Sequence, residues 1–293
     1  MLTPKLYGIC QVKNEDDIIA QSLTYGVQFC SKIFVIDNCS TDKTWNIVQS
    51  LSQQYPQIVP WLQTNEPYSE GMRALVYNQY HSELSDHDWW LVLDADEFLV
   101  EDPHILMQQA MREKADVICS WQIHFYFTDV DYQNWLNGND NRDVPICLRR
   151  RYYLINWQEA RLFRNRSARP WDAKINKFFP DGFRKACRRR ILNRHYQFRD
   201  PEQIQKRLSL RFGHSSFTHI KSTDWRSVIV PARRLNYKKD GETWRFSASG
   251  LAQYYGIVAK NLCYATLKKL VSVSSFGSTR RPCHLEQGVR KIR

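Results

Sequence analysis

Short apolar runs alternate with amphipathic stretches along the first half of the chain. Four of these runs, each long enough for one buried strand and too short for a typical helix, lie at residues 6–12, 33–36, 58–62 and 89–93. Between them we expect helices after Asn14, which is a good N-cap residue, after the polar turn 37–42, and from about Met72 to Leu84. This alternation predicts an α/β fold with a mostly parallel sheet and helices on both faces.

The pattern is less regular beyond residue 113. We expect one more strand at 116–127, a loop at 134–143, and helices at 201–212 and 251–271. No stretch reaches the roughly 18 consecutive apolar residues of a membrane span, and the N-terminus leads directly into the first strand. Neither a spanning helix nor a secretory signal is therefore expected.

Carboxylates gather where the most apolar strand ends. Asp94, Asp96 and Glu97 follow the run Trp89–Leu93 directly, which places them at the carboxyl edge of the sheet, where open α/β sheets bind ligands. Crowded carboxylates repel one another unless a cation or a proton lies between them. Because Mg²⁺ and Mn²⁺ bind through one or two carboxylates plus substrate phosphates, the pattern predicts a metal-assisted phosphate or nucleotide site. Helix capping or simple surface charge is the alternative.

A second acid, Asp37, ends the strand at 33–36 and is expected at the same edge. Among small polar residues it is well placed to accept hydrogen bonds from a base or a ribose. Alternatively, Asp37 and Ser40 cap the helix that follows.

Charge divides the chain into two unequal halves. Residues 1–146 hold 8 Lys and Arg against 21 Asp and Glu, whereas residues 147–293 hold 34 against 9. The second half is therefore expected to meet an anionic partner such as phosphate, nucleic acid or an acidic membrane surface. The 8 cysteines form no metal-binding spacing, which indicates reduced thiols in a cytoplasmic protein.

Three segments in order, 13–15 (Lys-Asn-Glu), 35–44 (Val-Ile-Asp-Asn-Cys-Ser-Thr-Asp-Lys-Thr) and 90–99 (Trp-Leu-Val-Leu-Asp-Ala-Asp-Glu-Phe-Leu), resemble glycosyltransferase family 2 enzymes of the GT-A fold. The likeness is greatest to the branch with the motif Asp-x-Asp-Glu-Phe. Residues 195–199 and Lys206 are similar to a segment found late in that branch. Lys43 and the pair Phe29-Cys30 depart from the family, which often has Gly at these places.

The resemblance implies a function and a set of binding residues. It implies a GT-A-like nucleotide-sugar part at residues 1–130, continuing into an acceptor-side, C-terminal helical region at 131–293. The implied reaction transfers a sugar, with inversion, from a nucleotide-sugar donor, taken as UDP-linked, to a polysaccharide or glycolipid acceptor. The residues that the resemblance assigns to the nucleotide are Asn14, Asp37, Arg73, Asn78 and Asp94. Those that it assigns to Mn²⁺ or Mg²⁺ are Asp94, Asp96 and His195, although His195 has a purely structural role as its alternative.

Transfer with inversion also needs a base that takes the proton of the acceptor hydroxyl. Acids are scarce in the basic half, so Asp172 is the first candidate and Glu159 the second. Each has an alternative role as the ion-pair partner of a neighbouring arginine, such as Arg161 or Arg169.

Two other functions remain open from the sequence. A haloacid-dehalogenase-like phosphohydrolase also carries Asp-x-Asp after a buried strand, but usually near its N-terminus, and Phe98 does not fit its pattern. Nucleic-acid binding through the basic stretches 149–151 and 184–190 is the second, with aromatic residues such as Trp157 for stacking. The acidic first half would repel a polyanion, so no nucleic-acid partner is expected. Peripheral contact with the anionic inner face of a membrane remains an option.

Overall fold

The computed structural model describes residues 3–172, 178–213, 217–238 and 244–273, and of residues 261–273 it describes the backbone only. Contacts within the chain separate it into two units, residues 1–250 and residues 251–293. The first unit holds the sheet and the candidate site, and the second holds most of the helix α8 (Ala248–Val273).

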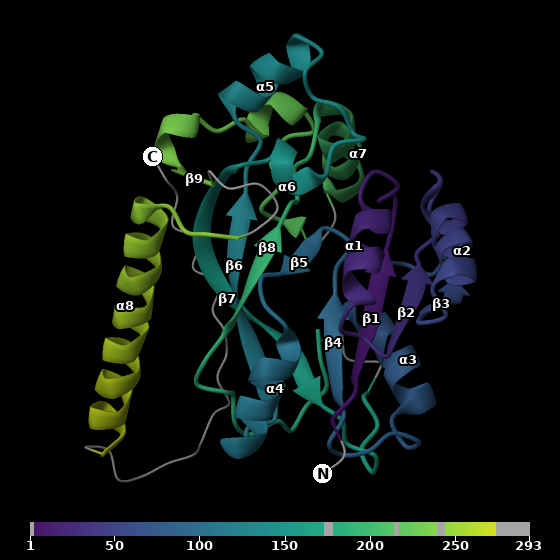
Figure 1. The fold of residues 1–293 in the computed structure, drawn as a ribbon, viewed down its shortest axis with the longest axis vertical. Helices are drawn as coiled ribbons and strands as arrows, with labels where there is room; N and C mark the ends of the chain where they lie inside the picture. The colour runs from purple at the N-terminus through teal and green to yellow at the C-terminus, as the bar shows by residue number, and fades with distance from the viewer. Residues whose placement is uncertain (1–2, 173–177, 214–216, 239–243, 274–293) are drawn as a thin grey trace. The chain divides into compact units, whose positions relative to one another are not determined.

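One mixed sheet runs through the first unit (Figure 1). Its strand order is β3 (Ile58–Gln63), β2 (Lys32–Asp37), β1 (Leu6–Val12), β4 (Trp89–Leu93), β7 (Tyr152–Arg164), β6 (Val117–Phe125), β8 (Ile191–His195) and β5 (Glu97–Leu99), and β9 (Asn236–Tyr237) pairs with β7. The strands from β3 to β4 are parallel, as expected from the strand-helix alternation. Beyond β4 the sheet departs from the predicted parallel arrangement, because β7 is antiparallel to both β4 and β6, and β8 is antiparallel to β5.

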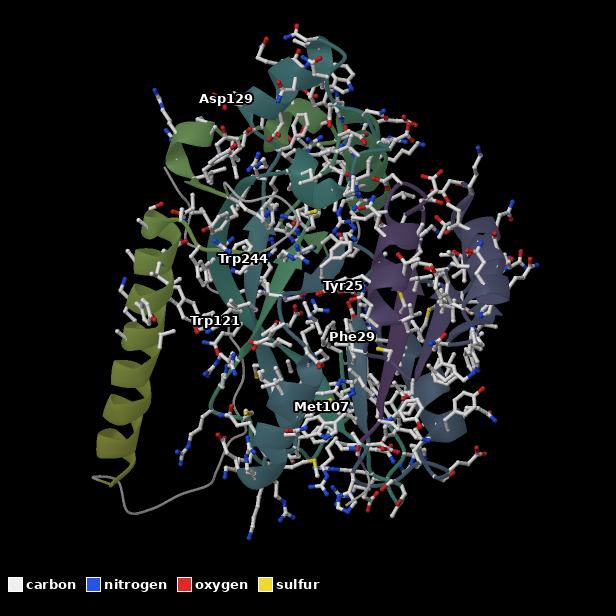
Figure 2. The ribbon with its side chains drawn as sticks, in the orientation of Figure 1. Tyr25, Phe29, Met107, Trp121, Asp129 and Trp244 are labelled. Atoms are coloured by element: carbon white, nitrogen blue, oxygen red, sulfur yellow. The ribbon has the colours of Figure 1, made fainter. Side chains whose placement is uncertain are left out.

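Apolar helices cover the two faces of the parallel half. Helix α3 (Arg73–Tyr80) packs against the face that carries Tyr7 and Phe34. Helix α1 (Ile19–Gly26) lies close to the opposite face, where a Cβ on Gly26 would come within 2.8 Å of the Ile33 side chain. Tyr25, labelled in Figure 2, packs on Phe98 of β5 and donates a hydrogen bond of 2.6 Å to the carbonyl of Leu99.

The remaining helices connect the strands. They are α2 (Thr44–Gln54), α4 (Pro103–Arg112), α5 (Asp129–Leu136), α6 (Ile146–Arg149) and α7 (Pro201–Arg211), with short 3-10 turns at Glu70–Met72, Trp225–Val228 and Ala232–Arg234. The predicted helices after residue 41, at 72–84, at 201–212 and at 251–271 correspond to α2, α3, α7 and α8. The predicted loop at 134–143 is wrong at its start, because α5 continues to Leu136 on a capping box formed by Thr128 and Asp131.

Asn14 does not cap a helix. Helix α1 begins only at Ile19, and Asn14 adopts a left-handed backbone conformation with φ of 55°. Its side-chain oxygen accepts a hydrogen bond of 2.7 Å from the backbone nitrogen of Thr41. Asn14 therefore joins the turn after β1 to the turn after β2.

In the described part of the chain, helices lack the combination of length and apolar character that crossing a membrane requires. Six cysteines are free thiols there, namely Cys10, Cys30, Cys39, Cys119, Cys147 and Cys187. The side chain of Cys263, and the whole of Cys283, lie outside the described residues.

Candidate active site

Two of the carboxylates that follow β4, Asp94 and Asp96, pair with different side chains. Asp94 accepts hydrogen bonds from Arg73 at 3.0 Å and from Arg161 at 2.8 Å. Burial alone would raise the pKa of the Asp94 carboxyl, but Arg161 and Arg73 together hold this pKa below its usual range. Its side chain keeps 28% of its surface exposed, so an ionised carboxylate faces the edge of the sheet.

Asp96 has a different set of partners. His195 Nε2 lies 3.4 Å and Arg207 Nη1 lies 3.1 Å from Asp96 Oδ2. Burial opposes ionisation, but His195 and then Arg207 hold the pKa of Asp96 well below its usual range. The chain brings His195 here because β8 pairs with β5 in antiparallel register, which sets His195 opposite Glu97.

Glu97 belongs to the floor of the site. It accepts hydrogen bonds from Arg161, from Asn193 of β8, and at 3.3 Å from Gln122 of β6. Burial raises the pKa of the Glu97 carboxyl well above its usual range. Its side chain is only 3% exposed, so Glu97 joins three strands and does not meet solvent.

Arg73 and Arg161 form one cationic layer. The ring of Phe178 lies 5.0 Å from the guanidinium carbon of each arginine. Asn78, expected to face a nucleotide, instead bonds the backbone of Trp171, donating to its carbonyl at 2.7 Å and accepting from its nitrogen at 2.7 Å. Asn78 thus anchors the chain shortly before Phe178, and this contact differs from the predicted one.

Asp37 lies two strands from Asp94, because β1 separates β2 from β4. Asp37 and Asp94 therefore lie at the same carboxyl edge of the sheet, as expected from their positions at the ends of parallel strands. Asp37 is fully buried and accepts hydrogen bonds from Gln63 at 2.7 Å and from the backbone nitrogen of Ser40 at 3.1 Å. The alternative that Asp37 caps the next helix is wrong, since Asp42 accepts the bond from the first residue of α2, Thr44.

The two candidates for the base occupy different surroundings. Glu159 of β7 lies 2.7 Å from Arg161 and accepts a hydrogen bond of 3.2 Å from Gln122. Its side chain remains 32% exposed. Asp172 is exposed and follows Trp171, and residues 173–177 beside it lie outside the described part. The structure thus brings Glu159 into the cluster around Asp94.

Helix α7 and the segment before it supply cations to which the sequence assigned no role. Arg199 pairs with Asp17 at 2.6 Å, and it also contacts Glu15. Arg207 reaches both Asp96 and, at 3.5 Å, Glu15. Arg211, one turn further along the same helix face, packs over the ring of Phe217 at 4.5 Å. The spacing of Arg207 and Arg211 was the one available signal, because residues four apart share a helix face.

These pairs change the interpretation of the charge division. Arginines of the basic half, among them Arg161, Arg199 and Arg207, neutralise acids of the first half across the site. Part of the polarity in the sequence therefore serves contacts within the chain.

The described residues contain no group of three or more His, Cys, Asp and Glu side chains placed to hold a metal ion. They do contain the pair Asp96 and His195, with Asp94 beside it on the same turn. A carboxylate with an imidazole suits Mn²⁺, and one or two protein ligands suffice when substrate phosphates complete the coordination. The donor set therefore fits a divalent ion that binds together with a phosphorylated substrate.

Comparison with protein families matches residues 12–195 to the model described as glycosyl transferase family 2. A comparison with curated proteins gives no match. Among solved structures, the chain is similar to the mannosyltransferase PcManGT from Pyrobaculum calidifontis, solved in complex with GDP-Man and Mn²⁺. The two chains share 15% identity with a TM-score of 0.34, over 56% of this chain and 45% of that one. This chain thus aligns with less than half the length of that protein.

Proposed function

The chain belongs to glycosyl transferase family 2, and from this membership we propose that it is a metal-dependent glycosyltransferase that takes its sugar from a nucleotide-sugar donor. The observation that carries the proposal is the edge formed by Asp94, Asp96 and His195. Two carboxylates are kept ionised there by arginines and a histidine from helices and strands that are far apart in the sequence.

Asp96 and His195 would hold Mn²⁺ or Mg²⁺, with Asp94 between the ion and the ribose. When bound, the ion supplies positive charge to the diphosphate that leaves with the nucleotide. The protein adds to this charge, since Arg207 and Arg211 extend along one face of α7 beside Asp96. Preorganised cations of this kind stabilise the charge that develops on a leaving group.

The far end of the same edge would bind the nucleoside. Asp37 lies at the end of β2, and Asn14 holds the turns after β1 and β2 together. We assign the nucleobase to this end of the edge, and the donor as UDP-linked. Asp37 would accept a hydrogen bond from the nucleobase, while the hydrogen bonds from Gln63 and Ser40 fix the orientation of the Asp37 carboxylate.

In this proposal Glu159 is the general base that takes the proton of the acceptor hydroxyl, and the transfer proceeds with inversion. Its carboxylate lies next to Arg161, which also binds Asp94, and is partly exposed, so an acceptor hydroxyl can reach it. The acceptor would be a saccharide of a polysaccharide or a glycolipid. Contact of the basic half with an anionic membrane surface would bring a lipid-linked acceptor to the enzyme.

Thermal unfolding with UDP, GDP, CMP or ADP, each with and without Mn²⁺, tests the donor site. A ligand at about 100 times its Kd raises the free energy of unfolding by about 2.7 kcal/mol. We therefore expect one nucleotide to raise the Tm, and to do so only when the metal is present. Asp96→Asn should remove the metal-dependent part of this shift, whereas the exposed control Asp143→Asn should retain it. No shift with any nucleotide would contradict the proposal.

Turnover provides the second test. Asp96→Ala should abolish sugar transfer while the far-ultraviolet circular dichroism spectrum stays that of the wild type. A fully active Asp96→Ala enzyme would remove Asp96 from the metal site.

A further inference from the structure

Trp157 keeps 47% of its surface exposed although it lies beside the buried polar floor of the site. Its indole packs against His124 of β6, with ring centroids 3.9 Å apart. Glu159, two residues along the same strand, bonds Gln122 of β6 at 3.2 Å. Because Gln122 and His124 alternate with residues of the opposite face, Trp157 and Glu159 share one face of the sheet.

A short chain of rings connects Trp157 to the metal edge. The rings of His124 and His195 are 4.6 Å apart, and His195 Nε2 is 3.4 Å from Asp96. One imidazole, that of His124, thus separates the exposed indole from His195, a predicted metal ligand.

His124 is unfavourable for stability if its only role is to pack in the sheet. It is fully buried, and among the described residues neither of its ring nitrogens has a hydrogen-bond partner. A buried polar group without a hydrogen-bond partner destabilises the folded protein. On the other face of β6, Trp121 and Ile123 are buried in apolar surroundings, as packing demands. Stability alone therefore does not explain the polar residues Gln122 and His124 on this face of β6.

We propose that Trp157, supported from below by His124, is a platform on which a pyranose ring stacks. The inference rests on the proposed function and specifies where its sugar lies. An aromatic face offers a large apolar contact to the C–H groups of a sugar. Glu159 on the same face, and Asn156, which donates to the Tyr126 hydroxyl at 2.8 Å, place polar groups beside it for the sugar hydroxyls. The ring belongs to the transferred sugar or to the acceptor, and binding experiments distinguish these sources.

The experiment compares the wild type with Trp157→Ala, Trp157→Phe and the control Trp135→Ala, in which another exposed tryptophan, outside the site, is removed. The first arm measures the affinities of UDP, UDP-glucose, UDP-galactose, GDP and GDP-mannose with Mn²⁺ by calorimetry. The second measures contact with methyl glucoside, galactoside and mannoside by saturation-transfer nuclear magnetic resonance, in the presence of the nucleotide that binds.

Loss of an aromatic contact should weaken sugar binding by about 3- to 10-fold, with partial recovery in Trp157→Phe. A loss for nucleotide sugars, with the free nucleotide unchanged, assigns the platform to the donor sugar. A loss confined to the methyl glycosides assigns it to the acceptor. Trp157→Ala that matches Trp135→Ala in both arms overturns the inference. Absence of nucleotide binding in the wild type overturns the proposed function separately.

Discussion

Arg161 shows how one side chain determines the state of several acids. It reaches Asp94 at 2.8 Å and Glu159 at 2.7 Å, contacts Glu97, and is only 3% exposed. Since removing one partner of a buried ion pair leaves an uncompensated charge, Arg161→Met should lower the free energy of unfolding by about 3–5 kcal/mol.

Urea denaturation at neutral pH measures this loss. The control is Arg189→Met, because Arg189 pairs with Glu101 at the surface and should cost no more than about 1 kcal/mol. Equal losses in the two variants would show that Arg161 contributes no more than a surface pair.

Residue-scale roles were the hardest to predict from the sequence. The sequence singled out Asp94 and Asp96 because a buried strand ends just before them. Arg207 was not singled out, because its partner Asp96 is 111 positions away and only the packing of α7 brings them together. The contact between His124 and Trp157 likewise could not be predicted, because it depends on the register of β6 and β7.

The stability of helix α7 depends on the ionisation of its N-cap residue, Asp200. Asp200 accepts a hydrogen bond of 3.0 Å from the backbone nitrogen of Gln203, and Arg142 binds its carboxylate at 2.8 Å. Burial opposes ionisation, but Arg142 and the helix lower the pKa of Asp200 to about 2. Because the folded pKa is below the unfolded value of about 3.9, the stabilisation is complete above that value and is lost as the pH falls toward 2.

Asp200→Asn keeps a good cap residue and removes only the charge. It should be less stable than the wild type by about 2 kcal/mol at pH 7, and the difference should vanish as the pH approaches 2. Denaturant unfolding over this pH range measures both. A difference that stayed constant with pH would mean that the charge is unimportant.

At the level of elements, the sequence predicted the parallel half well. Its strands are short apolar runs, such as Trp89–Leu93, whose burial on both faces produces a pattern that can be recognised without the structure. β7 was not predicted, because it carries polar residues such as Gln158 and Glu159 on a strand that lines the site. A functional face removes the alternation on which strand prediction depends.

The whole first unit is expected to unfold as one. The sheet continues across residue 130, where the sequence suggested a change of organisation, since β7 pairs with both β4 and β6. Arg199 also joins the segment before α7 to Glu15 and Asp17 near α1. Residues 1–250 should therefore show a single cooperative transition.

Circular dichroism and tryptophan fluorescence test this prediction together. The fluorescence sums all 10 tryptophans, which include Trp89 and Trp90 in the parallel half and Trp225 beyond it. Coincident midpoints in urea are expected. Two separated transitions would mean that the halves fold independently.

The pairing of β8 with β5 also sets the order in which the protein matures on the ribosome. β1, β2 and β4 have all been translated once residue 93 has emerged. His195 reaches Asp96 only after a further hundred residues have been translated and β8 has entered the sheet. The strands of the proposed nucleoside end are therefore translated well before the strand that completes the proposed metal edge.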